Sequence, residues 1–543
     1  MTAANTSSAD FGEVFTRRWI VELILDLVGY TSDRDLSALR LVEPSVGSGA
    51  FFIPIVERLI VSARRHGKDL VSLKNALFGI DLQKEHVDTC RRRTIDLLVQ
   101  SGISVDGAQE IAEKWLQHGD FLLSKIPGGA DFVVGNPPYI RTENLDNSRE
   151  KLYRKYWKTM RGRSDIYIGF YERGLDLLAE EGRLGFICAD RWMHNAYGTP
   201  LRELITTSYA VESIWHMHSL NSFESEVSAY PAITVLANKK QAAVSVINTE
   251  PAFDGQGAHE ALEFACGSKD EGIGSNWEGA RISSWFKTSD FWPVGAPNTI
   301  KLLESLQEKY FPLDSDGQTR ISIGVATGAD KAYIIDKDAF TVIEEDRLLP
   351  LVTTDDIRSG YLKQPKKLLL NPWDEEGQLI DLEMYPQFAK ALEAHPEVRT
   401  RYIAKRNPDK WYRTIDKVHP GLVACPKLLF QDMKINITPV LEPGGYYPHH
   451  NLYYIVSTSW DLEVLGGLLL SRVAEAFVRA YGVKMRGGTM RFQAQYLRKI
   501  VVPRPEQIPS AVADRLRSAF QTSNREEATR AAEEAYGLPA GTI

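Results

Sequence analysis

The sequence has few cysteines, no long apolar run and no excess of positive charge. Its four cysteines, Cys90, Cys188, Cys266 and Cys425, lie far apart and form no CxxC pair. We therefore expect neither a metal site nor a disulfide framework. No apolar run reaches the roughly 18 residues that a membrane-spanning helix needs. The polar start MTAANTSSADFGEV lacks the apolar core of a secretory signal, so we expect a cytoplasmic protein without membrane contact.

The net charge of −7 over 543 residues gives no global indication of a nucleic-acid partner. Affinity for phosphate depends on the face that a protein presents, so any such site must come from local basic patches. The length exceeds what one hydrophobic core usually organises and predicts two or three domains.

What the sequence does contain is a regular alternation of short apolar runs and helical spacing over residues 1–240. Strand-like runs at 39–42, 77–80, 131–134 and 184–188 alternate with helical patterns such as 17–28, 50–64 and 84–100. This order predicts an α/β fold, a doubly wound, Rossmann-like parallel sheet whose ligands bind at the carboxyl ends of the strands.

The remaining sequence differs in character from this first domain. Residues 241–290 mix Gly, Ser and charged residues and are expected to form a linker or excursion. Residues 291–543 contain short strand-like runs, many turn residues and clustered basic and aromatic side chains, followed by a charged helical segment at 510–536. We expect a second domain of mixed α+β type there.

The strongest glycine cluster, EPSVGSGAFF, runs from Glu43 to Phe52, follows a strand and opens a helix. Gly47 and Gly49 would let a ligand approach the backbone closely. The spacing fits neither the dinucleotide pattern nor the P-loop pattern. A GxG after a strand can also be a plain tight turn.

Two carboxylates follow the next strands of this pattern. Asp81 ends the run LFGID and is placed to accept hydrogen bonds from ribose hydroxyls. Asp120 and Phe121 offer an acceptor and an aromatic ring for an adenine. Each residue alone has an ordinary structural explanation, such as a helix cap for Asp81. Their order at the ends of successive strands favours a nucleoside-binding site.

The tetrapeptide Asn136-Pro137-Pro138-Tyr139 follows the apolar run DFVVG. With the motifs before it, this stretch resembles the gamma-type, TaqI-like amino-group DNA methyltransferases of restriction–modification systems. The resemblance implies S-adenosylmethionine as cofactor, with S-adenosylhomocysteine as product. It also implies an adenine, flipped out of duplex DNA, as the acceptor of the methyl group on its exocyclic N6.

The resemblance also assigns roles to individual residues. The side-chain oxygen of Asn136 and the carbonyl of Pro137 would accept the two amino hydrogens of the base. Pro138 would keep the loop rigid, and Tyr139 would stack on the base. Phe223 would face the base from the other side, although an isolated Phe before a strand is more often a core residue. The cofactor-binding residues implied are Thr16, Glu43, Pro44, Gly47, Gly49, Asp81, Asp120 and Phe121.

Basic residues that interleave with aromatic ones are candidates for DNA contacts. They fall after the catalytic loop and in two later stretches, the second of which overlaps a run that resembles the end of this family's recognition domains. For any single residue a solvated helix face is the better explanation. The candidates are Arg141, Arg154, Lys155, Arg161, Arg163, Arg399, Arg401, Lys405, Arg406, Arg413, Lys484, Arg486 and Arg491.

Three alternatives remain open at this point. Exocyclic N4 of cytosine is chemically similar to N6 of adenine, and some RNA and protein-glutamine methyltransferases use the same NPPY motif. A non-catalytic recognition subunit is a further alternative, against which the intact Asn136, Tyr139 and Asp81 argue. Our prediction is a stand-alone DNA (adenine-N6) methyltransferase: residues 1–240 catalytic, 241–290 linker and 291–543 target recognition. Double-stranded DNA is its expected partner, and a separate cognate restriction endonuclease is the partner that such a system would supply.

Overall fold

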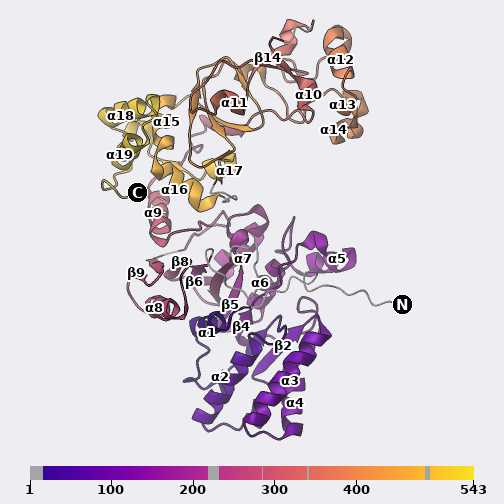
Figure 1. The fold of residues 1–543 in the computed structure, drawn as a ribbon, viewed down its shortest axis with the longest axis vertical. Coiled ribbons are helices and arrows are strands. Elements are labelled where there is room, and N and C mark those ends of the chain that lie inside the picture. Colours follow the sequence, from indigo (N-terminus) through magenta and orange to yellow (C-terminus); the bar gives the residue numbers. More distant parts are fainter. Residues whose placement is uncertain (1–15, 218–230, 284, 339–341, 483–488) are drawn as a thin grey trace. The chain divides into compact units, whose positions relative to one another are not determined.

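The computed structural model describes residues 16–217, 231–283, 285–338, 342–482 and 489–543. They fall into two units, Met1–Leu302 and Leu303–Ile543, whose elements are labelled in Figure 1. Among the described residues, no helix has the length and apolar character needed to cross a lipid bilayer.

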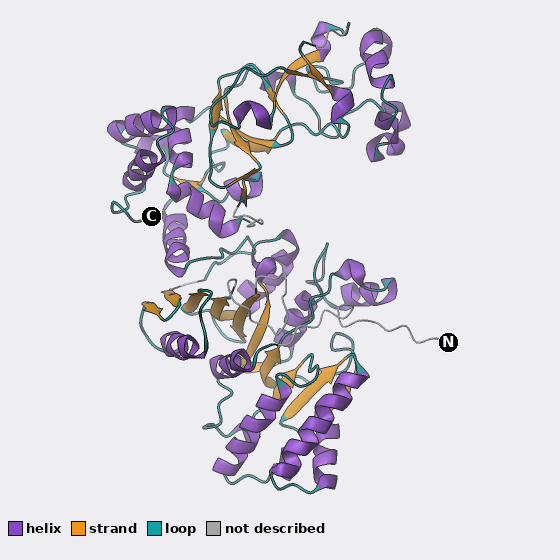
Figure 2. Cartoon of the chain, viewed as in Figure 1, coloured by secondary structure: helices purple, strands orange, loops and turns teal. Residues whose placement is uncertain are grey.

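The first unit is built on a ten-stranded mixed sheet, drawn in orange in Figure 2, with the order β3-β2-β1-β4-β5-β7-β6-β8-β10-β9. The pairs β3–β2, β2–β1, β1–β4 and β4–β5 are parallel, and β7 runs antiparallel to both of its neighbours. The strands are β1 (Leu41–Glu43), β2 (Leu77–Asp81), β3 (Leu116–His118), β4 (Ala130–Gly135), β5 (Leu178–Ala189), β6 (Ala210–His216), β7 (Pro231–Ala237), β8 (Val244–Thr249), β9 (Glu271–Gly274) and β10 (Trp277–Ile282).

Helices cover both faces of this sheet, because its central strands are apolar on both faces. Leu41 of β1 belongs to the core on one face, and the adjacent Val42 belongs to the core on the other. One core contains α1, α2, α3, α4 and α8, and the other contains α6 and α7. The helices are α1 (Arg18–Val28), α2 (Phe52–Arg65), α3 (Lys84–Gln100), α4 (Val105–Trp115), α5 (Asn147–Tyr156), α6 (Tyr167–Asp176), α7 (Thr199–Ser208) and α8 (Gly255–Cys266).

The prediction of a linker at 241–290 is wrong in structural terms. This segment contains β8, α8, β9 and β10, and β8 pairs in parallel with β6 inside the large sheet. The first unit accordingly extends to Leu302. Glycines within the elements themselves, such as Gly272 and Gly274 in β9 and Gly279 in β10, obscured these short strands in the sequence.

The second unit contains two four-stranded sheets, β12-β20-β16-β18 and β13-β15-β14-β19, together with two short ribbons. Helices and sheets both contribute, as expected for an α+β unit. The strands are β11 (Phe311–Pro312), β12 (Thr319–Ile323), β13 (Ile334–Asp336), β14 (Leu348–Val352), β15 (Lys367–Leu370), β16 (Lys427–Gln431), β17 (Met433–Lys434), β18 (Val440–Glu442), β19 (Tyr447–Pro448), β20 (Leu452–Ser457), β21 (Met490–Arg491) and β22 (Val501–Val502).

Helices occur along the whole described part of the second unit, and most of the longer ones lie toward its C-terminal end. The expected helical segment at 510–536 is two helices, α18 and α19, which are separated near Ser523, a residue with a left-handed φ of 52°. The helices are α9 (Pro297–Lys309), α10 (Asp330–Tyr333), α11 (Thr354–Ile357), α12 (Pro386–Glu393), α13 (Glu397–Thr400), α14 (Tyr402–Arg406), α15 (Leu462–Leu470), α16 (Arg472–Tyr481), α17 (Ala494–Leu497), α18 (Ser510–Gln521) and α19 (Arg525–Ala535). Of these, α9 spans the boundary between the units.

Candidate functional site

A cavity of about 360 Å³ lies in the first unit, where the chain leaves the carboxyl ends of β1, β2 and β4. The strand order changes direction around β1, which has β2 on one side and β4 on the other. Loops separate at such a point and leave a crevice for a ligand. The sequence-predicted residues that line this cavity are Thr16, Glu43, Pro44, Gly47, Asp81, Asp120, Phe121, Asn136, Pro137 and Pro138.

The glycine loop forms one wall of the cavity. Gly47 has φ +51°, and a Cβ on it would meet no atom within 4 Å, so its backbone faces open space. Gly49, with φ +98°, does not line the cavity, since a Cβ there would lie 3.1 Å from Cys90 Sγ on α3. Gly47 therefore offers the close approach, and Gly49 serves the packing of the turn against a helix.

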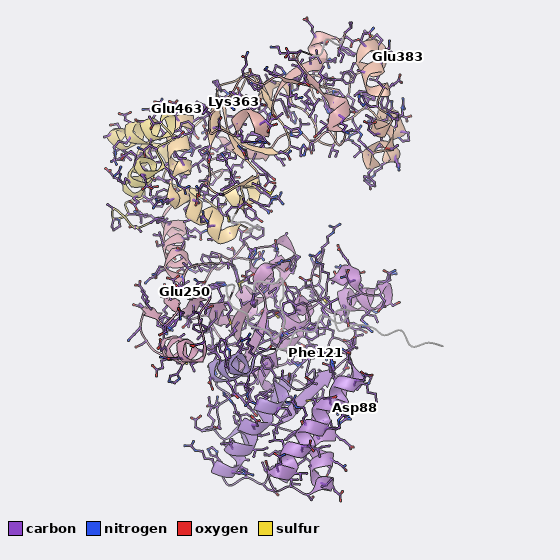
Figure 3. All side chains as sticks on the ribbon, in the orientation of Figure 1. Asp88, Phe121, Glu250, Lys363, Glu383 and Glu463 are labelled. Carbon is purple, nitrogen blue, oxygen red and sulfur yellow. The ribbon has the colours of Figure 1, made fainter. Side chains whose placement is uncertain are left out.

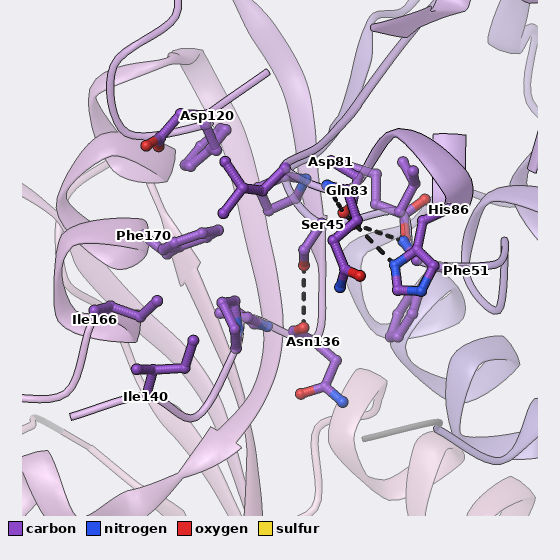
Figure 4. A pocket seen from close by; sticks show the side chains of 18 of the residues that line it. Ser45, Phe51, Asp81, Gln83, His86, Asp120, Asn136, Ile140, Ile166 and Phe170 are labelled. Carbon is purple, nitrogen blue, oxygen red and sulfur yellow. Dashed lines mark hydrogen bonds and ion pairs between the residues drawn. The ribbon is translucent and has the colours of Figure 1, made fainter. Parts of the chain in front are cut away.

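Asp81 fixes this loop as well as lining the cavity (Figure 4). Its Oδ2 accepts a hydrogen bond from the Gly47 amide at 2.9 Å, and its Oδ1 accepts one from the Gln83 amide at 2.9 Å. His86 Nδ1 lies 3.7 Å from Oδ1. A carboxylate has about four acceptor positions, so these contacts leave capacity for the hydroxyls of a ligand.

Glu43 is almost completely buried at the end of β1, with 1% of its surface exposed. Its Oε2 has no hydrogen-bond partner among the described residues. Burial, and secondly the nearby charge of Asp81, raise the pKa of Glu43 well above its ordinary value. A buried carboxylate without a partner is costly, so this atom marks a position that a cationic ligand group would satisfy.

The tetrapeptide Asn136 to Tyr139 leaves the end of β4 and forms another wall. Asn136 Nδ2 donates a hydrogen bond to Thr16 Oγ1 at 3.2 Å, and Ser45 Oγ donates to the Asn136 carbonyl at 3.1 Å. The first bond ties the loop to the segment before α1, and the second, drawn in Figure 4, ties it to the glycine loop. The amide of Asn136 thereby has a defined direction.

Tyr139 does not line the cavity with the other three residues of its motif. Its ring packs partly against both cores of the first unit, and its centroid lies 6.2 Å from that of Tyr167. Burial raises the pKa of Tyr139, and its hydroxyl donates to the Ile187 carbonyl at 3.5 Å. The other predicted base-facing residue, Phe223, lies outside the described residues.

Asp120 and Phe121 contact protein groups that the sequence did not indicate. Asp120 Oδ2 accepts a hydrogen bond from the hydroxyl of Tyr153 on α5 at 2.7 Å. Phe121, labelled in Figure 3, is 3% exposed, and its ring stacks on Phe170 with centroids 5.0 Å apart. Arg173 lies over the Phe121 ring at 5.0 Å. Phe170 therefore shares this wall of the cavity with Phe121.

Comparison with known proteins identifies the group to which the chain belongs. Residues 75–223 match the family described as Eco57I restriction-modification methylase. The type II methyltransferase M.XhoI of Xanthomonas vasicola is 40% identical, over 97% of this chain and 97% of that protein. The type II methyltransferase M.PaeR7I of Pseudomonas aeruginosa is 41% identical, over 97% and 92%.

The chain belongs to the type II DNA methyltransferases of restriction–modification systems. Among solved structures, the type IIL restriction-modification enzyme MmeI in complex with DNA has a similar fold. It matches this methyltransferase with a TM-score of 0.53 and 12% identity, over 97% of this chain and 74% of that one.

The basic residues predicted for DNA contact differ in their surroundings in the methyltransferase. Arg154 and Arg401 have their guanidinium groups occupied by the protein itself. Arg154 donates to the Met160 and Gly162 carbonyls, and Arg401 donates to the Trp411 and Arg413 carbonyls. Both hold loops together in this structure.

Several other basic candidates have further partners or lie outside the described residues. Arg399 stacks over Trp411 at 3.7 Å, Arg413 lies over Trp373 at 5.7 Å, and Arg491 pairs with Asp432. Lys484 and Arg486 lie outside the described residues. The more exposed candidates are Arg141, Lys155, Arg161, Arg163, Arg399, Lys405 and Arg406.

A second hollow of about 730 Å³ in the first unit lies beside the end of the loop from Asn136 to Tyr139. Three predicted residues, Arg141, Arg161 and Arg163, line it, and Arg191 joins them. Glu143 and Asp165 contribute negative charge to the same hollow. Arg191 follows β5 without a basic neighbour in sequence, so no local charge cluster indicated it.

The first cavity is also lined by residues that the sequence did not indicate. Arg149 and Tyr153 line it from α5, four residues apart and so on one face of the helix. Ile166 and Phe170 line it from the start of α6, and His86 lines it from α3. The four-residue spacing of Arg149 and Tyr153 is a usable signal, but it lies within a basic segment whose charge favours a DNA contact.

Proposed function

We propose that this methyltransferase transfers a methyl group from S-adenosylmethionine to the exocyclic N6 of an adenine flipped out of duplex DNA. One observation carries the proposal: a single cavity is lined by Glu43, Asp81 and the Asn136-Pro137-Pro138 loop. Carboxylates suited to a cationic nucleoside and acceptors suited to an amino group thus share one site.

The charge of the cavity fits the proposed cofactor. Four carboxylate residues line it, Glu43, Asp81, Asp120 and Asp146, against one arginine, Arg149. S-adenosylmethionine, when bound, supplies a methyl group on a sulfonium centre and also has an ammonium group. Glu43 would pair with the ammonium group, and Asp81 would accept from the ribose hydroxyls. The volume of about 360 Å³ falls in the range of small-molecule sites.

Asn136 and Pro137 would act on the base. An aromatic amine is a weak nucleophile because its lone pair is delocalised into the ring. Two acceptors that engage both amino hydrogens, the Asn136 Oδ1 and the Pro137 carbonyl, favour a more tetrahedral nitrogen. The nitrogen would take the methyl group as the bond between that group and the sulfonium sulfur breaks, which leaves S-adenosylhomocysteine. One amino proton would pass to water, and no bond to the protein would form.

Preorganisation of this loop supports the mechanism. Pro137 and Pro138 restrict two successive φ angles, and the Ser45 hydroxyl holds the Asn136 carbonyl. The bond from Asn136 Nδ2 to Thr16 sets the direction of the amide, with Oδ1 as the acceptor proposed for the base. Acceptors that are already in place need little reorganisation during the reaction.

The target base and the DNA contacts complete the proposal. Tyr139 and Phe223 would stack on the extruded adenine, which offsets roughly 1–3 kcal/mol of lost base stacking per ring. Arg141, Arg161, Arg163 and Arg191 would contact phosphates beside the catalytic loop. The second unit would supply target recognition, and a cognate endonuclease would be a separate protein.

The alternative that remains is exocyclic N4 of cytosine, which the same acceptors would serve. Incubation with radiolabelled S-adenosylmethionine and unmethylated duplex DNA, followed by nucleoside analysis, separates the two. Label in N6-methyladenine is the expected result. Label in N4-methylcytosine would overturn the choice of base but keep the mechanism, and no label in DNA would contradict both.

A further inference from the structure

The second unit contains a cluster of potential metal ligands that lies apart from the methyl-transfer site. Among the described residues, one group of His, Cys, Asp or Glu side chains has three ligand atoms within 4.8 Å of one another. Its members are Asp330, His449 and His450. Asp330 begins α10, and the two histidines follow β19 directly.

The backbone holds both histidines in place. The His449 amide donates to the Val352 carbonyl at 3.0 Å, and the His450 amide donates to the Val325 carbonyl at 3.1 Å. A Cβ on Gly324 would lie 2.3 Å from the His449 carbonyl oxygen, so the two segments approach as closely as glycine allows. Hydrogen bonds to two neighbouring segments therefore fix the backbone of both histidines.

The side-chain geometry is close to that of a metal site. Asp330 Oδ2 lies 3.0 Å from His449 Nε2 and 3.9 Å from His450 Nδ1. In a tetrahedral zinc site with bonds of about 2.0–2.1 Å, neighbouring ligand atoms lie about 3.3–3.4 Å apart. These two separations lie on either side of this value, and all three ligand atoms lie within 4.8 Å of one another, so side-chain movements would bring them around one ion.

A supporting hydrogen bond orients the carboxylate. The hydroxyl of Thr327, a fully buried residue, donates to Asp330 Oδ1 at 2.5 Å. The Ala329 amide in turn donates to Thr327 Oγ1 at 3.1 Å. Oδ1 thus accepts the hydrogen bond from Thr327, while Oδ2 faces the imidazoles. Hydrogen bonds from residues that do not bind the metal commonly orient a metal-binding carboxylate in this way.

Solvent reaches the cluster on one side. Asp330 and His450 line a hollow of about 380 Å³ together with Lys331 and Glu397. A bound ion would therefore complete its coordination with water. Two imidazole nitrogens and one carboxylate oxygen suit Zn²⁺ better than Mg²⁺ or Ca²⁺, which prefer oxygen ligands.

We propose that Asp330, His449 and His450 form a Zn²⁺ site that cross-links α10 to the β19–β20 connection of the second unit. The proposal does not depend on the methyl-transfer mechanism. The ion would connect segments that are 119 residues apart in the sequence. Its expected effect is to stabilise the second unit rather than to take part in chemistry.

His450→Ala is the selective variant, because His449 also makes a hydrogen bond to Asp330 that stabilises the protein without metal. The matched control is His419→Ala, an exposed histidine of the same unit. The full-length chain is stripped with a chelator, dialysed and titrated with Zn²⁺ alone, and calorimetry and thermal unfolding are recorded.

Wild type and His419→Ala should bind one Zn²⁺ per chain. At about 100 times the dissociation constant, the midpoint of unfolding should rise by about 5–10 °C. His450→Ala should unfold like metal-free wild type but bind Zn²⁺ about 10–100-fold more weakly. Equal affinity in His450→Ala, or no shift in wild type, would overturn the proposal.

A measurement on wild type alone covers the case in which His450→Ala does not fold. Co²⁺ replaces Zn²⁺ in such sites and absorbs visible light more strongly in four-coordinate than in six-coordinate sites. The expected result is a strong band that saturates at one Co²⁺ per chain and that Zn²⁺ displaces. A weak spectrum like that of hydrated Co²⁺ would contradict the site.

Discussion

Glu43 illustrates at the scale of one residue how a binding site reduces the stability of the ligand-free protein. The fold buries its carboxylate near that of Asp81, and both burial and that charge raise the pKa of Glu43. The folded protein therefore holds this proton more tightly than the unfolded chain does. Stability from this group is fully present below the ordinary pKa of 4.5 and is lost as pH rises through the raised value.

Replacing Glu43 with Gln should stabilise the ligand-free protein at neutral pH. The variant avoids ionising a buried carboxylate, so its free energy of unfolding should exceed that of wild type by about 1–3 kcal/mol. The difference should shrink as pH falls toward 4.5. Thermal unfolding of both proteins across this pH range measures it, and calorimetry should show at least tenfold weaker cofactor binding. A less stable variant at neutral pH would contradict this account of Glu43.

Asn136→Ala tests the proposed acceptor. Removing the side-chain oxygen should lower kcat for methyl transfer about 10²–10³-fold, the usual cost of losing one preorganised electrostatic contact. Binding of cofactor, measured by calorimetry, should survive because Glu43 and Asp81 remain. Near-normal turnover in this variant would remove the proposed mechanism.

Asp81→Ala tests the ribose contact. We expect cofactor affinity to fall at least tenfold, because the variant loses a ligand contact and also the bond that holds the Gly47 amide. DNA affinity, measured by fluorescence anisotropy, should change less. Asp88→Ala on the surface of α3 is the matched control and should alter neither. A larger loss of DNA binding than of cofactor binding would move Asp81 out of the ribose site.

At the scale of elements, α5 forms part of the wall of the cofactor-side cavity. The hydroxyl of Tyr153 donates to Asp120 on the loop after β3 at 2.7 Å, and Tyr153 and Arg149 both line the cavity. This helix follows the catalytic loop directly. The hydrogen bond from Tyr153 to Asp120 therefore holds α5 against the loop after β3, and a shift of the helix would change this wall of the cavity.

Tyr153→Phe should loosen α5. Loss of a hydrogen bond to a carboxylate costs about 1.5–3 kcal/mol, so hydrogen exchange over 147–156 should accelerate and KM for the cofactor should rise several-fold. Tyr156→Phe, on the same helix and 58% exposed, is the matched control. Unchanged exchange in Tyr153→Phe would mean that packing alone holds the helix.

At the scale of the whole molecule, the boundary of the catalytic unit lies later than the sequence suggested. β8 pairs with β6, and β10 pairs with β8, so the sheet continues through residues 244–282. A chain cut at 240 would expose the edge of β6 that pairs with β8, and the apolar residues of β6 and β7 that share a core with α8.

We therefore expect residues 1–302 to fold alone and residues 1–240 to aggregate or unfold. The longer fragment should show a cooperative thermal transition and bind S-adenosylmethionine with nearly the affinity of the full chain. A folded, cofactor-binding 1–240 fragment would show that β8, α8, β9 and β10 are dispensable for the catalytic unit.

The sequence by itself determined the local features of this protein, namely the strands of the first unit and the polar residues that follow them. Apolar runs followed by Glu43, Asp81 and Asn136 predicted parallel strands with polar residues at their carboxyl ends, and the structure gathers these residues in one cavity. This succeeds because a central strand and the loop after it are short, contiguous segments whose pattern is visible in the chain.

Only the tertiary structure decided which distant residues meet. The hydroxyl of Tyr153 donates to Asp120, the guanidinium of Arg401 donates to a carbonyl of its own unit, and His449 forms a hydrogen bond with Asp330. The short strands of 244–282 are stable because they pair with a sheet that already exists, not because of their own pattern. Contacts between residues far apart in sequence leave no local periodicity, so only the packing of the folded chain determines which of these residues come together.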